Sequence, residues 1–142
     1  MPSDPIQVAC PACLTANRVP AARLGEDPKC GKCGAALLPE APLELAESEF
    51  DDFVRRTELP VIADFWAPWC GPCRSMAPHF ERAARELKGR ARLVKVNTEE
   101  APGLAARMGI RAIPTIALFR NGVEVKRVSG ALDAAALVRW AS

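Results

Sequence analysis

The stretch that decides the fold is A-D-F-W-A-P-W-C-G-P-C, residues 63–73. Its first residues continue an apolar run that begins at Pro60 and is typical of a buried strand. Cys70 follows where a helical pattern starts, and the partial positive charge at the start of a helix favours a thiolate. Cys73 lies three residues further on, and Pro72 fits the first turn, so the two sulfurs can be bridged on one side of the helix. These features predict a reactive, exposed Cys70 and a more sheltered Cys73.

A metal site is the alternative for this pair of cysteines. The chain has six cysteines in three C-x-x-C pairs, and the other two pairs lie together upstream. A metal site built from C-x-x-C motifs takes two of them, and the sequence has no fourth pair to complete a second site. The pair at 70 and 73 is therefore interpreted as a redox-active dithiol.

The composition is that of an ordinary soluble globular protein. The 142 residues are 49% hydrophobic and 25% charged, and the net charge of +2 is too small to indicate nucleic acid or an anionic membrane as a partner. No apolar stretch approaches the roughly 18 residues of a membrane span, and the start, M-P-S-D-P-I-Q-V, lacks the pattern of a secretory signal. These features predict a cytoplasmic protein whose cysteines serve metal binding or redox catalysis rather than a disulfide framework.

Helical and strand patterns alternate from residue 46 onward. Ser48 can cap a first helix whose apolar face holds Phe50, Phe53 and Val54. The later elements expected are a strand at 60–66, a helix at about 71–88 kinked at Pro78, a strand at 91–97, a short helix at 101–108, a strand at 114–120, a turn at Asn121-Gly122, a strand at 123–128, and a last helix capped by Asp133 that ends at Trp140. This order predicts the α/β class, with a central mixed sheet and helices on both faces.

The upstream cysteines have the spacing of a zinc site. The pattern C-x2-C-x16-C-x2-C falls in the range that zinc sites use, and four thiolates close the coordination of Zn²⁺, which favours a structural role. The ligands expected for one zinc ion are Cys10, Cys13, Cys30 and Cys33. Two ordinary disulfides or a second redox pair are the alternatives.

The chain divides into a zinc-ribbon module at 1–38, a linker at 39–45 that two prolines stiffen, and an α/β domain at 46–142. The module has too few large apolar residues to fold without a bound metal or a disulfide. It carries four basic and three acidic side chains, and a four-thiolate zinc centre adds negative charge. Because this is a poor electrostatic match for phosphate, we expect no nucleic-acid partner.

The chain resembles the thioredoxin family over about residues 43–142. The resemblance rests on the stretch quoted first, on Pro78, and on V-K-V-N at 94–97, R-A-I-P-T at 111–115 and V-S-G-A at 128–131. The two upstream C-x-x-C pairs are similar to those of the zinc-bearing bacterial thioredoxin 2 type. The resemblance implies the thioredoxin fold, and reduction of client protein disulfides with electrons from NADPH through thioredoxin reductase. We also expect a monomer without a bound organic cofactor.

The same resemblance implies roles for four residues. Cys70 is the nucleophile that attacks a client disulfide, and Cys73 is the thiol that releases the reduced client. Asp64 matches the family's buried acid; a lone carboxylate in an apolar strand is desolvated, which raises its pKa and suits it to accept the proton of Cys73 through a water. Lys95 matches a lysine near that acid. A hydrogen-bonded structural Asp64, and a Lys95 that only extends its ammonium into solvent, are the alternatives.

A client groove is expected beside the cysteine pair. The resemblance implies a cis peptide bond before Pro114, opposite the cysteines. The groove residues are Trp69, Gly71, Pro72, Ile113, Pro114, Gly130 and Ala131. Trp69 as an exposed packing residue is the alternative. Ala112 stands where many relatives have glycine, which reshapes the groove edge, and Arg74 stands where many have lysine, which keeps the charge. Neither departure affects the chemistry.

Two functions are compatible with these patterns. The first is a protein-disulfide reductase that carries the ribbon as an accessory. The second is a zinc-dependent redox-sensing or partner-docking protein, in which the ribbon docks partners and the pair at 70 and 73 only reports oxidation. The single histidine, His79, is expected on a helix surface, and Met76 and Met108 are expected in the core.

Overall fold

The central strand of the fold is buried on both of its faces. In the computed structural model, which describes residues 4–142, this strand is β4 (Val61–Trp66), and its successive side chains point to opposite faces. Ala63 and Phe65 pack against one helical layer, and Ile62 packs against the other. A strand buried on both faces needs helices on both sides, which is the α/β arrangement predicted from the sequence.

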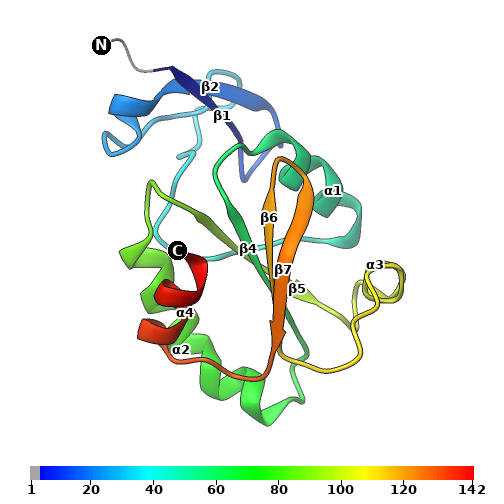
Figure 1. The fold of residues 1–142 in the computed structure, drawn as a ribbon. Coiled ribbons are helices and arrows are strands. Elements are labelled where there is room, and N and C mark those ends of the chain that lie inside the picture. Colours follow the sequence, from blue (N-terminus) through cyan, green and yellow to red (C-terminus); the bar gives the residue numbers. More distant parts are fainter. Residues whose placement is uncertain (1–3) are drawn as a thin grey trace.

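Five strands form the main sheet in the order β3-β5-β4-β6-β7 (Figure 1). Strands β3, β5 and β4 are parallel, β6 is antiparallel to β4, and β7 is antiparallel to β6. The elements of this domain are β3 (Leu43–Glu44), α1 (Glu47–Arg56), β4, α2 (Gly71–Glu86), β5 (Arg92–Asn97), α3 (Pro102–Arg107), β6 (Thr115–Arg120), β7 (Val123–Ser129) and α4 (Ala134–Ala141). The predicted mixed sheet is confirmed. Among residues 4–142, none of the helices has both the length and the apolar character needed to cross a bilayer.

Each helical layer has its own apolar core. Helices α1 and α3 cover one face of the sheet through Phe50, Phe53 and Leu104. Helices α2 and α4 cover the other face through Phe80 and Leu137. The sheet therefore separates two cores, and the cysteine pair at the start of α2 belongs to the second layer.

Two details at the start of this domain differ from the predictions. Helix α1 begins after Ala46, whose backbone N–H donates to Glu49 Oε1 at 2.8 Å, and Ser48 lies exposed within the helix. The predicted Ser48 cap is wrong, because Glu49 satisfies the free N–H at the helix start instead. The segment 39–45, predicted as a linker, contributes strand β3, which forms the edge of the main sheet beside β5.

The amino-terminal module is built on a small antiparallel hairpin. Its strands are β1 (Pro5–Ala9) and β2 (Ala16–Pro20), and a short 3-10 turn follows at Ala21–Arg23. The first C-x-x-C turn joins the two strands, and the second lies further along the chain between residues 29 and 36, which form an isolated bridge. Residues 1–3 of the predicted 1–38 module lie outside the described residues.

The module is docked on the main domain at the end of α1, as the top of Figure 1 shows. The Ala9 N–H donates to Thr57 Oγ1 at 3.2 Å, and the Glu58 N–H donates to the Gln7 carbonyl at 2.7 Å. Leu59 belongs to the same apolar cluster as the ribbon. These contacts lie at the amino-terminal end of β4, and α2 begins beyond its other end. A six-residue strand separates the two places by roughly 20 Å.

Candidate active site and metal cluster

The cysteine pair lies where β4 leads into α2. Cys70 occupies the position before the first helical residue, and its Sγ accepts the Cys73 N–H at 3.2 Å. The two sulfurs form a disulfide, with Cα atoms 5.2 Å apart, so the structure represents the oxidised form. Because backbone N–H groups at a helix start lack helical partners, they stabilise negative charge on the Cys70 sulfur once the bond is reduced.

Both cysteines are buried in the oxidised form. Cys70 is 4% exposed and Cys73 is 3% exposed, so the prediction of an exposed Cys70 is wrong for this form. The residues packed around them are Trp66, Ala67 and Ile113. Trp69, in contrast, is 65% exposed and presents an aromatic surface beside the pair, against which a polypeptide can lie.

The loop before β6 lies against the disulfide. The Ile113–Pro114 peptide bond is cis, as the resemblance implied, and the Ile113 carbonyl oxygen is 3.7 Å from Cys70 Sγ. The Pro114 carbonyl accepts the Gly130 N–H at 2.9 Å, which brings the end of β7 to the same place. The other predicted groove residues are exposed, namely Gly71, Pro72 and Ala131. The structure thus brings two distant loops beside the cysteine pair.

Asp64 is buried under helix α2. It shares a face of β4 with Ile62, which packs against α2, and it is 1% exposed. Neither of its carboxylate oxygens has a hydrogen-bond partner among the described residues. Burial raises the pKa of Asp64 to about 7, although the positive charge of Lys95 opposes this rise and Glu44 adds to it. The described residues leave this buried carboxyl without a hydrogen-bond partner, unlike the hydrogen-bonded aspartate that was the alternative.

Two further charged residues flank Asp64 in the sheet. In the strand register Glu44 of β3 lies opposite Lys95 of β5, which in turn lies opposite Asp64 of β4. The Lys95 ammonium is 4.5 Å from the centre of the Trp66 ring, a cation–π contact that holds it over the sheet. Burial raises the pKa of Glu44, and the charge of Lys95 opposes this rise. Sequence reasoning missed Glu44, because its only signal was a position in a segment taken for a linker.

The four thiols of the ribbon lie at the distances of a tetrahedral metal site. The Sγ atoms of Cys10 and Cys33 are 3.6 Å apart, those of Cys13 and Cys30 are 3.7 Å apart, and all four lie within 4.8 Å of one another. Four sulfurs at about 2.3 Å from one ion would be separated by roughly 3.8 Å. Each of these four described cysteines is free rather than disulfide-bonded. The cluster therefore fits a metal ion with four thiolate ligands.

Both C-x-x-C turns of the ribbon have the same backbone geometry. In each turn the first cysteine carbonyl accepts an N–H from four residues on, Leu14 at 2.8 Å and Gly34 at 2.9 Å. These two residues have φ values of 63° and 81°, a conformation that favours glycine. The backbone amide of Cys33, together with the Asn17 side chain, lowers the pKa of Cys30 to about 6. N–H groups aimed at sulfur stabilise the thiolate, which is the form that binds a metal.

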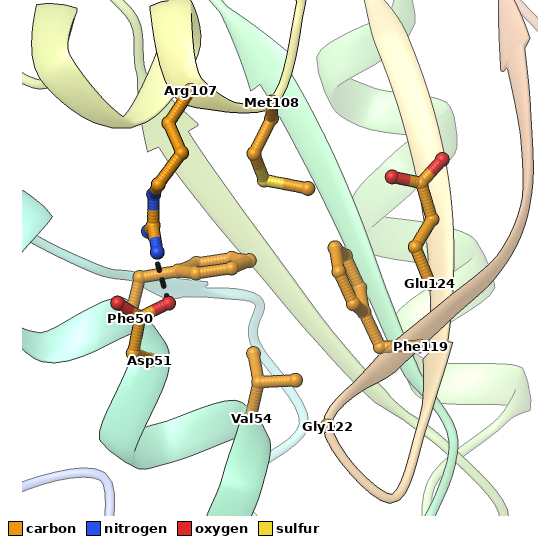
Figure 2. A pocket seen from close by; sticks show the side chains of 8 residues that line it. All are labelled: Phe50, Asp51, Val54, Arg107, Met108, Phe119, Gly122 and Glu124. Atoms are coloured by element: carbon orange, nitrogen blue, oxygen red, sulfur yellow. Dashed lines mark hydrogen bonds and ion pairs between the residues drawn. The ribbon is translucent and has the colours of Figure 1, made fainter.

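A cavity of about 250 Å³ lies on the other side of the sheet, between α1, α3 and the β6–β7 hairpin. Figure 2 shows Phe50 among its apolar walls and the ion pair of Asp51 with Arg107, at 3.0 Å, on its rim. Glu124, the third charged residue in its lining, pairs with Arg127 at 2.6 Å. Because these charges are paired, the cavity does not offer a free charge to orient an ionic ligand. Its place in the other helical layer separates it from the disulfide.

A disulfide at a helix start, a cis-proline loop against it and a buried carboxyl under the same helix define a protein-disulfide oxidoreductase. The family described as Thioredoxin matches residues 41–142, and the family described as Thioredoxin 2, N-terminal, a zinc ribbon, matches residues 9–35. The chain belongs to the thioredoxin family. Its members are protein-disulfide oxidoreductases that receive electrons from thioredoxin reductase and act on disulfide clients.

Individual relatives agree with this assignment. Thioredoxin C-3 of Corynebacterium nephridii is 44% identical over 133 residues, which cover 94% of this chain and 91% of the relative. The chloroplastic M-type thioredoxin of Spinacia oleracea is 40% identical over 105 residues, which cover 74% of this chain and 58% of the relative. The solved structure of a mutant thioredoxin from Halobacterium salinarum NRC-1 matches with a TM-score of 0.66 and 36% identity, and the match covers 72% of this chain and 89% of that one.

Proposed function

We propose that this protein is a protein-disulfide reductase in which Cys70 attacks the client and Cys73 resolves the mixed disulfide. The observation that carries the proposal is the Cys70–Cys73 disulfide at the start of α2, with the buried Asp64 under the same helix. Membership of the thioredoxin family supports the same chemistry. The electron donor is thioredoxin reductase, and the clients are proteins with accessible disulfides.

The reaction consists of two thiol–disulfide exchanges. The Cys70 thiolate attacks one sulfur of the client disulfide, forms a bond to it, and releases the other client sulfur as a thiolate. Cys73 then gives its proton to Asp64 through a water and attacks Cys70 Sγ, which releases the second client thiolate. The client gains two electrons and takes up two protons, while Cys70 and Cys73 become a disulfide. Thioredoxin reductase returns two electrons from NADPH to this disulfide.

The residues around the pair support these steps in different ways. Lys95 and Glu44 adjust the proton affinity of Asp64 through their charges. The client chain lies over the exposed Trp69 and along the cis-proline loop of Ile113, whose carbonyl is beside Cys70 Sγ. The other residues of this groove are the buried Pro114 and four exposed residues, Gly71, Pro72, Gly130 and Ala131.

The ribbon has a structural role in this proposal. Cys10, Cys13, Cys30 and Cys33 would hold one Zn²⁺ as a closed set of four thiolates, and this ion supplies folding energy to a module with a small apolar core. We propose a monomer that acts in the cytoplasm, where thiol ligands stay reduced.

Insulin reduction with NADPH and thioredoxin reductase tests the proposal. We expect turnover by the wild type, loss of turnover in Cys70→Ser, and accumulation of a client mixed disulfide in Cys73→Ser. A double variant of the ribbon, Cys10→Ser with Cys13→Ser, is the matched cysteine control and should keep most of the activity. Trapping of client by Cys70→Ser would reverse the assigned roles. A wild type without turnover would instead favour a redox-sensing or partner-docking protein.

A further inference from the structure

Two side chains of α2 hold the segment that joins β7 to α4. The Leu132 N–H lies 3.5 Å from Met76 Sδ, and the Ala134 N–H donates to His79 Nδ1 at 3.2 Å. Ala134 is the first residue of α4, where backbone N–H groups have no partner within the helix. His79 thus supplies an acceptor to a backbone donor that the helix itself leaves free.

The other end of this segment is tied to the disulfide. Gly130 donates its N–H to the Pro114 carbonyl at 2.9 Å, and the neighbouring Ile113 carbonyl lies 3.7 Å from Cys70 Sγ. Residues 130–134 therefore connect the cis-proline loop with the middle of α2. Gly130 lies against the cis-proline loop, and the hydrogen bonds at both ends help to hold the segment there.

A small surface cavity borders the segment between its two hydrogen-bonded ends. The cavity, of about 180 Å³, lies between α2 and residues 131–133, and Ser75, Met76 and His79 line its α2 side. Leu132 packs against the apolar core of α2 and α4, so packing and the two contacts with Met76 and His79 together hold the segment. Met76 is 1% exposed and is fixed in the core, whereas His79 is only half-buried and reaches the segment from the helix surface. His79 lies on α2 as expected, and its contact with Ala134 was not predicted.

We propose that His79 is a positioning residue for client binding, because its Nδ1 accepts the Ala134 N–H and so fixes the segment that carries Gly130 and Ala131 of the client groove. The inference rests on the proposed function of the chain as a disulfide reductase. A groove segment that is already ordered loses no further conformational entropy when a client binds. His79 therefore strengthens client binding without taking part in the exchange between thiols and disulfides.

Two substitutions separate this role from a merely structural one. His79→Leu removes the acceptor, whereas His79→Asn keeps one, because asparagine Oδ1 and histidine Nδ1 are both attached to Cγ. Insulin reduction by the full chain, with saturating reductase and NADPH, gives KM and kcat separately. We expect His79→Leu to raise the KM for insulin about threefold to tenfold, the range for loss of one hydrogen bond, with kcat within about twofold. His79→Asn should restore most of the lost affinity.

Ser75→Ala is the matched control, since Ser75 lines the same cavity without a hydrogen bond to the described segment 131–134. Its KM should equal that of the wild type. Amide hydrogen exchange provides a readout apart from activity: the Ala134 amide should exchange faster in His79→Leu than in the wild type or His79→Asn. An unchanged KM in His79→Leu, or an asparagine variant as weak as the leucine variant, would overturn the inference alone. A wild type without turnover would overturn the proposed function, and this inference with it.

Discussion

Replacing Asp64 by asparagine should stabilise the folded protein at neutral and alkaline pH but not in acid. Asparagine has nearly the same shape and cannot ionise, whereas Asp64 is 1% exposed and burial raises its pKa to about 7. A carboxyl with a raised pKa in the folded state binds its proton more tightly there than in the unfolded chain. The free energy of unfolding therefore decreases as the pH rises between the two pKa values.

The size of the effect follows from these two pKa values. The ordinary value is 3.8 and the value in the folded protein is about 7. Each pKa unit corresponds to about 1.4 kcal/mol. The loss of stability begins near pH 4, grows until about pH 7, and levels off at about 4 kcal/mol. This is a large part of the roughly 5–15 kcal/mol that stabilises a typical domain.

Urea unfolding followed by circular dichroism, from pH 4 to pH 9, measures the difference between the oxidised wild type and Asp64→Asn. The two free energies of unfolding should coincide near pH 4 and differ by about 4 kcal/mol at pH 8. Asp51→Asn is the control: this exposed carboxylate pairs with Arg107 at 3.0 Å, and its loss should change stability by less than about 1 kcal/mol. A difference that stays constant with pH would refute the reasoning, and an asparagine variant less stable at every pH would identify Asp64 as a structural acceptor.

Three further perturbations test the surroundings of the site. Lys95→Met removes the positive charge beside Asp64, so NMR titration of the Asp64 carboxyl carbon should give a higher pKa than in the wild type. An unchanged pKa would show that the charge of Lys95 does not act on Asp64. Removal of the proposed zinc ion by a chelator under reducing conditions should lower the melting temperature by about 5–10 °C and leave insulin reduction within about twofold, and near-complete loss of activity in a folded sample would contradict an accessory ribbon. The Cys70–Cys73 couple should have a potential near the thioredoxin value of about −270 mV, because its Gly-Pro dipeptide resembles that of reducing thioredoxins, and a value near −120 mV would contradict this.

The parts of the fold that local sequence determines could be predicted. The apolar run of β4 and the turn at Asn121-Gly122 lie where expected, and both turn residues have the positive φ that this turn needs. Strand β3 could not be predicted, because it has two residues and its Leu43 pairs with Val94, which lies far along the chain. The hairpin of the ribbon was also missed, because its two five-residue strands pair across the first C-x-x-C turn and carry few large apolar residues.

The candidate site could also be predicted where its residues are neighbours in the sequence, but not where they come from distant segments. The bridging of Cys70 and Cys73 and the desolvation of Asp64 could be predicted from the residues beside them. The burial of Cys70 could not, because it depends on Ile113, which reaches the disulfide from another loop. The partners of Glu44 and His79 also come from distant segments, so the type of each residue gave no indication of its contact.

The ribbon docks at one end of β4, and the disulfide lies beyond the other end. Leu59, just before this strand, belongs to the apolar cluster of the ribbon, whereas Trp66 at its other end packs beside the disulfide. The segment that follows the ribbon contacts Arg92, whose Nη1 donates to the Pro39 carbonyl at 3.3 Å. Burial lowers the pKa of Arg92 to about 10. A buried cation with one hydrogen bond and one cation–π contact costs free energy, so docking relies on the apolar cluster and on the hydrogen bonds of Ala9 and Glu58. Two of the four clustered cysteines belong to this apolar cluster. Loss of the proposed zinc ion should therefore loosen the junction of α1 and β4 first, because β4 is held on both faces by the two helical cores before it reaches the cysteine pair.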